Sequence, residues 1–243
     1  NIFQAAGDIY SSLLRREIKK NKVKPKLSFG FTTLKNILNS RIKNIKNIID
    51  CNTISQLKYI QRTLLLGLYV LHSPRRLEYG DMEIVTKKDY IKNKLDMVKK
   101  NYLIKGNSCS ERWAFQFGYY KTFPTYGIQK QPISKKLKEL IILCHAKMAN
   151  YKSIIGELHP NYKFKYLIVD TKRGEMERPK QYNGICQMLR SISKEEELED
   201  ILGNTMIRNL YIKEIKKNDK IKYKLNLNNM MALSINEKNL FLM

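Results

Sequence analysis

The chain has 243 residues, of which 46 are Lys or Arg and 22 are Asp or Glu, so its formal net charge is +24. With 43% apolar and 28% charged residues, the composition is that of a globular protein and excludes a disordered or fibrous chain. The longest apolar run, residues 64–71, is far too short for a bilayer span, so we expect no membrane association. No basic and then apolar leader opens the chain, so we do not expect secretion.

The excess of positive charge predicts a polyanionic partner. Self-repulsion destabilises a compact chain of charge +24, and nucleic acid is the commonest partner that compensates it. Lys, Asn and Ile are all abundant, which AT-rich coding also produces, so coding bias remains an alternative source of part of the charge. We expect double-stranded DNA as the partner, with further protein subunits of a viral or nucleoprotein assembly as additional candidates.

The first half of the chain reads as basic helices followed by short strands. Helical periodicity covers residues 9–18 and 34–49, and the second of these has a basic outer face. Between them lies a lysine run that suggests a DNA-contacting arm, made of Lys19, Lys20, Lys22, Lys24 and Lys26. A third helix is predicted from Ile54 to Leu71, with Thr53 or Ser55 as its N-cap. Short β-type runs follow at residues 102–104 and 113–117.

The second half returns to helices after one more strand. A helix is predicted over residues 134–149 and an apolar strand over residues 164–169. Further helices are predicted over residues 182–190, 195–202 and 206–217, with a short one near the C-terminus. The predicted fold class is therefore α+β, mostly helical, with a small antiparallel sheet and a short basic helical segment in front.

The cysteines and histidines give no metal-site spacing. No two of the four cysteines form a CxxC pair, and the three histidines are scattered. We expect reduced cysteines, no bound metal and no small-molecule cofactor.

Four fragments carry the candidate chemistry: residues 71–79, 115–127, 202–212 and 231–241. They place Arg76 beyond a helix end, Lys121 in a turn after a strand, and Arg208 in a late helix. Three such cations could converge on one phosphate, because Arg offers bidentate contacts and Lys a point charge. The alternative is that each is an ordinary exposed cation, of which this chain has many.

These fragments resemble the catalytic domain of tyrosine recombinases, in particular the integrases of virophages, large DNA viruses and related mobile elements. Ser-Pro-Arg-Arg-Leu-Glu-Tyr, residues 73–79, is similar to the first arginine box, which gives the catalytic position to Arg76 and leaves Arg75 as a DNA-contacting neighbour. An alignment shifted by one residue would exchange these two. The resemblance also implies the catalytic-lysine role for Lys121 and the second arginine role for Arg208.

Three positions depart from the family pattern. The resemblance implies a histidine where this chain has Thr205, and a histidine or tryptophan where it has Leu233. The nucleophilic tyrosine position holds Phe241, which lacks the hydroxyl needed for a covalent phosphotyrosyl intermediate. The pattern predicts an inactive relative that keeps the phosphate-holding cations.

Three other groups of residues have two interpretations each. The aromatic residues around Lys121 could stack on bases or pack in the core; they are Tyr119, Tyr120, Phe123 and Tyr126. The acidic run over residues 195–200 could bind a metal, but a solvated helix start is the favoured interpretation. Lys172 and Arg173 suggest a phosphate-contacting loop or a plain exposed turn.

Together these patterns predict two parts, a basic helical DNA-clamping segment over residues 1–53 and a recombinase-like domain over residues 54–243. The predicted function is DNA binding without strand cleavage, in a structural, packaging or regulatory role. Two alternatives remain: an active recombinase that uses a tyrosine outside this chain or from a partner, and a basic scaffold of a virion or ribonucleoprotein. We expect an intracellular setting, in a viral particle, viral factory, nucleus or organelle nucleoid.

Overall fold

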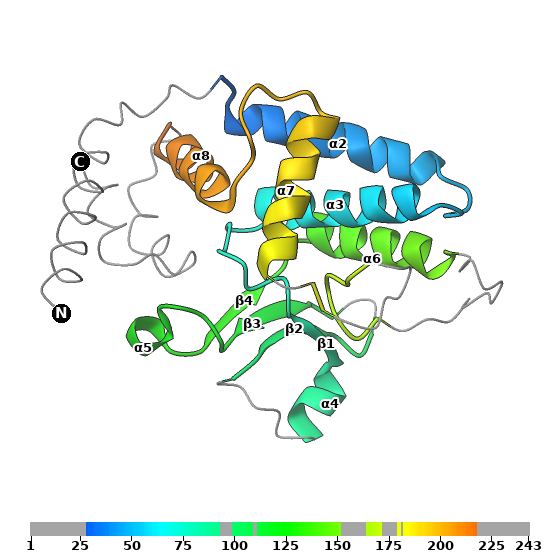
Figure 1. Cartoon of the computed structure of the whole chain (residues 1–243). Coiled ribbons are helices and arrows are strands. Elements are labelled where there is room, and N and C mark those ends of the chain that lie inside the picture. The colour runs from blue at the N-terminus through cyan, green and yellow to red at the C-terminus, as the bar shows by residue number, and fades with distance from the viewer. Residues whose placement is uncertain are drawn as a thin grey trace, which may run out of the picture.

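The computed structural model describes residues 28–92, 99–108, 111–151, 164–171, 179–180 and 182–217. Its elements form a mixed α/β fold in which a layer of helices lies beside a four-stranded sheet (Figure 1). Within the described ranges no helix is both long and apolar enough to span a membrane.

The helix α3, Ile54–Val70, is the centre of the helical layer. It packs against α2 (Phe31–Asn47), α6 (Lys135–Ala149) and α7 (Tyr182–Glu195), and Figure 1 shows α2 and α6 on either side of it. Every residue from 63 to 70 is buried, as expected for a helix with neighbours on several sides. The approach of α6 is close, because a Cβ on Gly67 would lie 2.1 Å from Leu140 Cδ2.

Local signals set the starts of these helices. Thr53 is the N-cap of α3: its hydroxyl accepts from the backbone N–H of Gln56, whose side chain accepts from the Thr53 N–H in a capping box. Ser134 caps α6 in the same way by accepting from the Leu137 N–H. The helix predicted over residues 34–49 is observed as α2, which starts three residues earlier with the buried Phe31 against Tyr211.

The four strands follow one another in the order β1-β2-β3-β4. They are β1 (Glu83–Thr86), β2 (Asn101–Lys105), β3 (Ala114–Phe117) and β4 (Gln129–Pro132). The prediction of an antiparallel sheet was wrong for one pair, because β1 and β2 are parallel while the other two pairs are antiparallel. The connection after β1 begins with the helix α4 (Lys87–Lys92), and such a crossover returns the chain to the same strand direction. A short helix, α5 (Phe123–Tyr126), joins β3 to β4.

The apolar segment 164–169 runs beside β1 but forms no strand of the sheet. Glu83 and Tyr166 make an isolated antiparallel bridge, with the Ile84 N–H donating to the Lys165 carbonyl at 2.8 Å. A second isolated bridge joins Val169 to Pro179. The strand predicted here is therefore reduced to bridges, and its buried residues cover the edge of β1.

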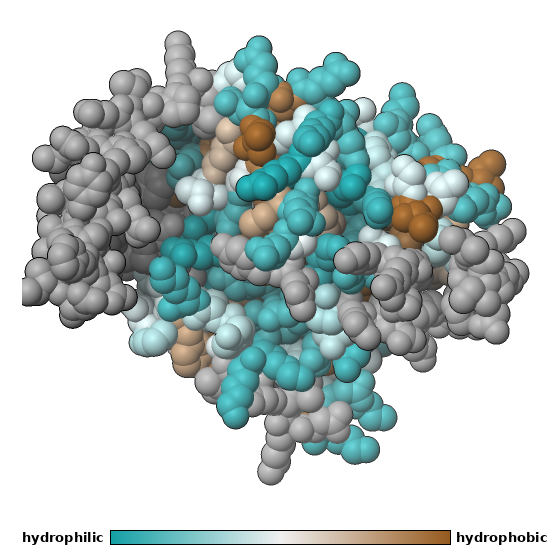
Figure 2. Space-filling model, in the orientation of Figure 1, coloured by the Kyte–Doolittle hydropathy of each residue, from teal (hydrophilic) through white to brown (hydrophobic). Residues whose placement is uncertain are grey.

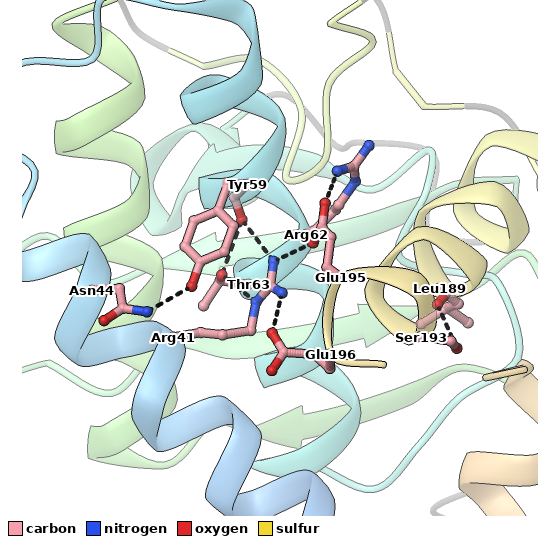
Figure 3. Close-up of polar contacts among 9 residues, drawn as sticks. All are labelled: Arg41, Asn44, Tyr59, Arg62, Thr63, Leu189, Ser193, Glu195 and Glu196. Carbon is pink, nitrogen blue, oxygen red and sulfur yellow. Dashed lines mark hydrogen bonds and ion pairs between the residues drawn. The ribbon is translucent and has the colours of Figure 1, made fainter. Parts of the chain in front are cut away.

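The helix predicted over residues 195–202 is absent, because α7 ends at Glu195 and the next helix is α8, Asn204–Lys217. Glu197 has a positive φ of 49°, which stops the helix. The Ser193 hydroxyl accepts from the Leu202 N–H at 2.6 Å and so holds the turn. The same hydroxyl donates to the Leu189 carbonyl oxygen at 3.4 Å (Figure 3). The acidic run thus follows the C-terminal end of a helix rather than opening one.

Two arginines neutralise this acidic end of α7. The buried Arg41 of α2 pairs with Glu195 at 2.9 Å and Glu196 at 2.6 Å, and Arg62 of α3 also pairs with Glu195 (Figure 3). Arg41 further donates to the Thr63 hydroxyl and stacks over the Tyr59 ring. Carboxylates are unfavourable at a helix C-terminus, so these cations offset that cost and join α2, α3 and α7.

One hydrophobic core joins α2 to the rest of the described chain. Phe31, Leu34, Leu38 and Ile45 belong to the same cluster as the buried face of α3. The described part of the segment predicted as a DNA clamp, residues 28–53, is therefore packed into the fold, and residues 1–27 lie outside the described ranges.

Candidate phosphate-binding site

Arg76, Lys121 and Arg208 line one cavity of about 640 Å³. They come from the loop after α3, the loop after β3, and α8, so only folding brings them together. Lys180, which precedes α7, is the fourth cation on the wall. Four cations around one cavity form an environment suited to phosphate oxygens.

The first turn of α8 contributes the wall on one side of the cavity. Asn204 and Thr205 line the cavity together with Arg208, which follows one helical turn later on the same face. Arg208 is only 3% exposed, so its guanidinium is held by packing rather than solvated. The first backbone N–H groups of a helix have no acceptor within the helix, so this end of α8 carries a partial positive charge.

Asn101 holds the turn that presents Lys121. Its side-chain oxygen accepts from the backbone N–H groups of Gly118 at 3.1 Å and Tyr119 at 3.0 Å, and its amide donates to the Tyr119 carbonyl at 2.9 Å. Asn101 is 1% exposed and is the first residue of β2. Its hydrogen bonds therefore join the start of β2 to the turn that follows β3. Lys121 itself is exposed and lines the cavity.

The two adjacent arginines after α3 occupy different environments. Arg76 is partly exposed and lines the cavity, whereas Arg75 is fully buried. The Arg75 guanidinium lies 4.0 Å from the Phe117 ring centroid and donates to Gln129 Oε1 at 2.6 Å. Burial lowers the pKa of Arg75 while the nearby Glu78 counteracts that shift. Arg75, predicted to contact DNA, is therefore buried among these partners and is not among the residues that line the cavity.

A buried polar cluster fixes the backbone at Arg76. The Tyr69 hydroxyl donates to the Arg76 carbonyl oxygen, and His72 Nδ1 lies 3.1 Å from the Tyr79 hydroxyl. Burial, reinforced by Arg75, lowers the pKa of His72 to about 4. His72 is therefore a neutral structural group at physiological pH.

Two carboxylates also line the cavity. Glu78 is 9% exposed, and its Oε2 is buried with no hydrogen-bond partner among the described residues. Burial raises the pKa of Asp81, and the amide of Asn101 opposes that rise. Across the wall, Lys180 donates to Asp170 Oδ1 at 2.7 Å. The described lining of the cavity therefore includes both cations and carboxylates, and it is not purely basic.

The aromatic residues around Lys121 were expected either to pack in the core or to be available for stacking on bases, and their exposure differs. Tyr120 is 9% exposed and packs edge-on against Phe123, and both Phe123 and Tyr126 lie against the core. Tyr119 is 63% exposed and lines the cavity. Among these four residues, Tyr119 is thus the one whose side chain is mostly exposed.

The structure tests only some of the predicted positions. Thr205, which stands in a histidine position of the resembled family, is exposed on the cavity wall. Several predicted residues lie outside the described ranges: Lys19, Lys20, Lys22, Lys24, Lys26, Lys172, Arg173, Leu233 and Phe241. The described residues contain no cluster of three or more His, Cys, Asp or Glu side chains suited to a metal.

Sequence reasoning missed Lys180 and Asn101. Lys180 precedes an ordinary helix start, and its place on the wall depends on Gly80, where a Cβ would lie 2.5 Å from the Lys180 carbonyl oxygen. Asn101 reads as a polar residue before a strand, and only the geometry of the turn shows its function. Neither position carries a local signal that could have identified it.

We compared the chain with models of protein families, with curated proteins and with solved structures, and none of the three comparisons found a match.

Proposed function

We propose that the cavity binds the phosphate backbone of DNA and that the chain is a DNA-binding protein with a recombinase-like arrangement of cations. The observation that carries the proposal is that Arg76, Lys121 and Arg208, chosen from three separate fragments, line one cavity. The net charge of +24 supports it, because phosphate contacts release counterions and so drive binding.

The proposal includes the absence of strand cleavage. Phosphoryl transfer through a covalent intermediate needs a nucleophile, and the position that the resemblance gives to it holds Phe241. Cations that hold a phosphate remain useful for binding after such chemistry is lost. The role of the protein on DNA is then structural, packaging or regulatory.

The binding test compares two substitutions of equal charge change. Lys121→Gln removes an exposed cation from the cavity, while Lys136→Gln removes an exposed cation of α6 that does not line it. For Lys121→Gln we expect weaker duplex binding by fluorescence anisotropy and a log–log salt slope shallower by about 0.9. Lys136→Gln is expected to change the duplex affinity and the salt slope much less. Equal effects of the two would contradict a specific role for the cavity.

Two further measurements separate the alternatives. A nicked suicide duplex analysed on a denaturing gel is expected to give no protein–DNA adduct, and an adduct would establish an active recombinase. Competition between duplex DNA and structured RNA distinguishes a DNA-binding protein from a ribonucleoprotein scaffold. Preferential displacement by RNA would favour the scaffold.

A further inference from the structure

A second cavity, of about 260 Å³, lies next to the first and shares Lys180 with it. Its walls come from two helices, with Lys58, Gln61 and Arg62 on α3 and Gly184, Gln187, Met188 and Ser191 on α7. Thr171 and Lys180 complete the lining. Lys180 lines both cavities, so an extended ligand that passes Lys180 can reach from one to the other.

The described lining of this second cavity includes three cations and no carboxylate. Lys58 is exposed, and Arg62 is partly exposed with one guanidinium nitrogen on Glu195. A guanidinium has five N–H donors, so this ion pair leaves donors for a ligand. The remaining polar groups are amides and hydroxyls, which also donate to phosphate oxygens. The chemistry therefore favours an anion at least as strongly as that of the first cavity, which contains Glu78 and Asp81.

Packing holds the shared Lys180 in place between the two cavities. Its ammonium donates to Asp170 Oδ1 at 2.7 Å, and its backbone N–H donates to the Ile168 carbonyl at 3.1 Å. Its carbonyl lies against Gly80, where even a methyl group would not fit. The ammonium group of Lys180 is therefore held at one position between the two cavities, whereas an ordinary surface lysine rotates freely.

We propose that the second cavity binds a further phosphate of the same nucleic-acid strand whose backbone occupies the first. This inference rests on the proposed DNA-binding function. Phosphates recur about every 3.4 Å of axis along each strand, so a strand that crosses Lys180 brings neighbouring phosphates to both cavities. Lys58 and Arg62 are then the cations that bind the second phosphate.

The experiment measures duplex DNA binding to the full chain by fluorescence anisotropy over a range of salt concentrations. Four proteins are compared: Lys58→Gln, Lys121→Gln, the double variant, and the control Lys136→Gln, whose residue lines neither cavity. Lys58 is exposed at the surface of α3, so its substitution is not expected to disturb folding. We expect Lys58→Gln to weaken binding several-fold and to lower the salt slope by about 0.9, and the double variant to lower it by about 1.8.

The outcomes separate this inference from the proposed function. If Lys121→Gln weakens binding while Lys58→Gln behaves like the control, the second cavity takes no phosphate and the inference is wrong. If only Lys58→Gln has an effect, the first cavity takes no phosphate, which contradicts the proposed function together with this inference. If both variants behave like the control, the proposed function itself fails.

Discussion

Arg75 and Arg76 are neighbours in the sequence, yet one is a packing residue and the other lines the cavity. The stacking of Arg75 on Phe117 and Tyr120, together with its bond to Gln129, shows why its side chain points inward. A guanidinium can form such stacked and hydrogen-bonded contacts when buried, whereas an ammonium forms them less well.

Matched substitutions at these two arginines are expected to separate stability from binding. Arg75→Gln removes a buried charge from its partners and is expected to lower the free energy of unfolding by about 3 kcal/mol. Arg76→Gln is expected to cost less than about 1 kcal/mol and to weaken DNA binding instead. Urea denaturation and anisotropy titrations check both. If Arg76→Gln were the more destabilising variant, the assignment of the two roles would be reversed.

Two buried histidines predict a pH-dependent stability. Burial lowers the pKa of His72 and of His145 to about 4, against an unfolded value of 6.5. Between these values the unfolded chain binds more protons, so stability is lost as the pH falls from 6.5 towards 4. Each histidine contributes up to about 1.4 kcal/mol per pH unit.

His145→Gln tests this pH dependence directly. His145 Nε2 lies 3.2 Å from the Leu167 carbonyl oxygen, and a glutamine amide can donate to the same acceptor. The free energy of unfolding is measured by urea denaturation between pH 6.5 and pH 5, which is above the pH at which most carboxylates titrate. It is expected to change less with pH in the variant than in the unsubstituted protein. An unchanged slope would contradict the lowered pKa of His145, because it would mean that this group binds as many protons in the folded protein as in the unfolded chain.

At the scale of elements, the shape of the cavity depends on a close contact between two backbone segments. Gly80 lets the segment before α7 lie against the loop after α3, with the Lys180 carbonyl 2.5 Å and Ile185 Cγ1 3.1 Å from where a Cβ would stand. The carbonyl is backbone and cannot rotate away as a side chain could. This contact sets the distance between Lys180 and the other cations.

Gly80→Ala is therefore expected to lower both stability and DNA affinity. Overpacking of this kind costs about 1–3 kcal/mol, and the shift it forces moves Lys180 away from the cavity. Gly30→Ser is the control, because no atom of the described residues lies within 4 Å of a Cβ there and serine is favoured at the N-cap of a helix such as α2. Urea denaturation and duplex titration of both variants provide the measurement. Full affinity in Gly80→Ala would show that Lys180 does not depend on this contact.

Element ends show where sequence patterns succeed and where they fail. The start of α3 at Ile54 was predicted with Thr53 or Ser55 as its N-cap, and the capping box identifies Thr53. A cap of this kind is a local interaction, so the sequence pattern can indicate it. The acidic run was predicted to open a helix, and this was wrong, because Arg41 and Arg62 bind Glu195 and Glu196 at the end of α7. Those arginines lie on helices more than a hundred residues away, so no local pattern contains this information.

At the scale of the whole molecule, the shared core predicts a single unfolding transition of the described fold. Phe31, Leu34 and Leu38 of α2 are buried with the residues of α3 rather than in a core of their own. The fluorescence of the single tryptophan, Trp113 in the loop before β3, and the far-ultraviolet circular dichroism are expected to change at the same urea concentration. Two separate transitions would indicate that α2 unfolds independently.

Deletion of residues 1–53 is a second test of whether α2 is part of one cooperatively folded unit. It removes α2, whose Phe31, Leu34, Leu38 and Ile45 share one core cluster with the buried residues of α3, and so opens that core to water. We expect the shortened chain to aggregate or to lose cooperative unfolding. A soluble, cooperatively folded product would establish the boundary predicted at residue 53.

The sequence alone predicted a mostly helical fold with a small sheet, most helices of the described ranges, and three of the four cations that line the cavity there. Helical periodicity and capping residues are local, and the charge balance needs no structure at all. The tertiary structure decided which of Arg75 and Arg76 faces the cavity, that β1 and β2 are parallel, and that Lys180 joins two cavities. Each of these depends on contacts between segments far apart in the chain, whose packing no local pattern records.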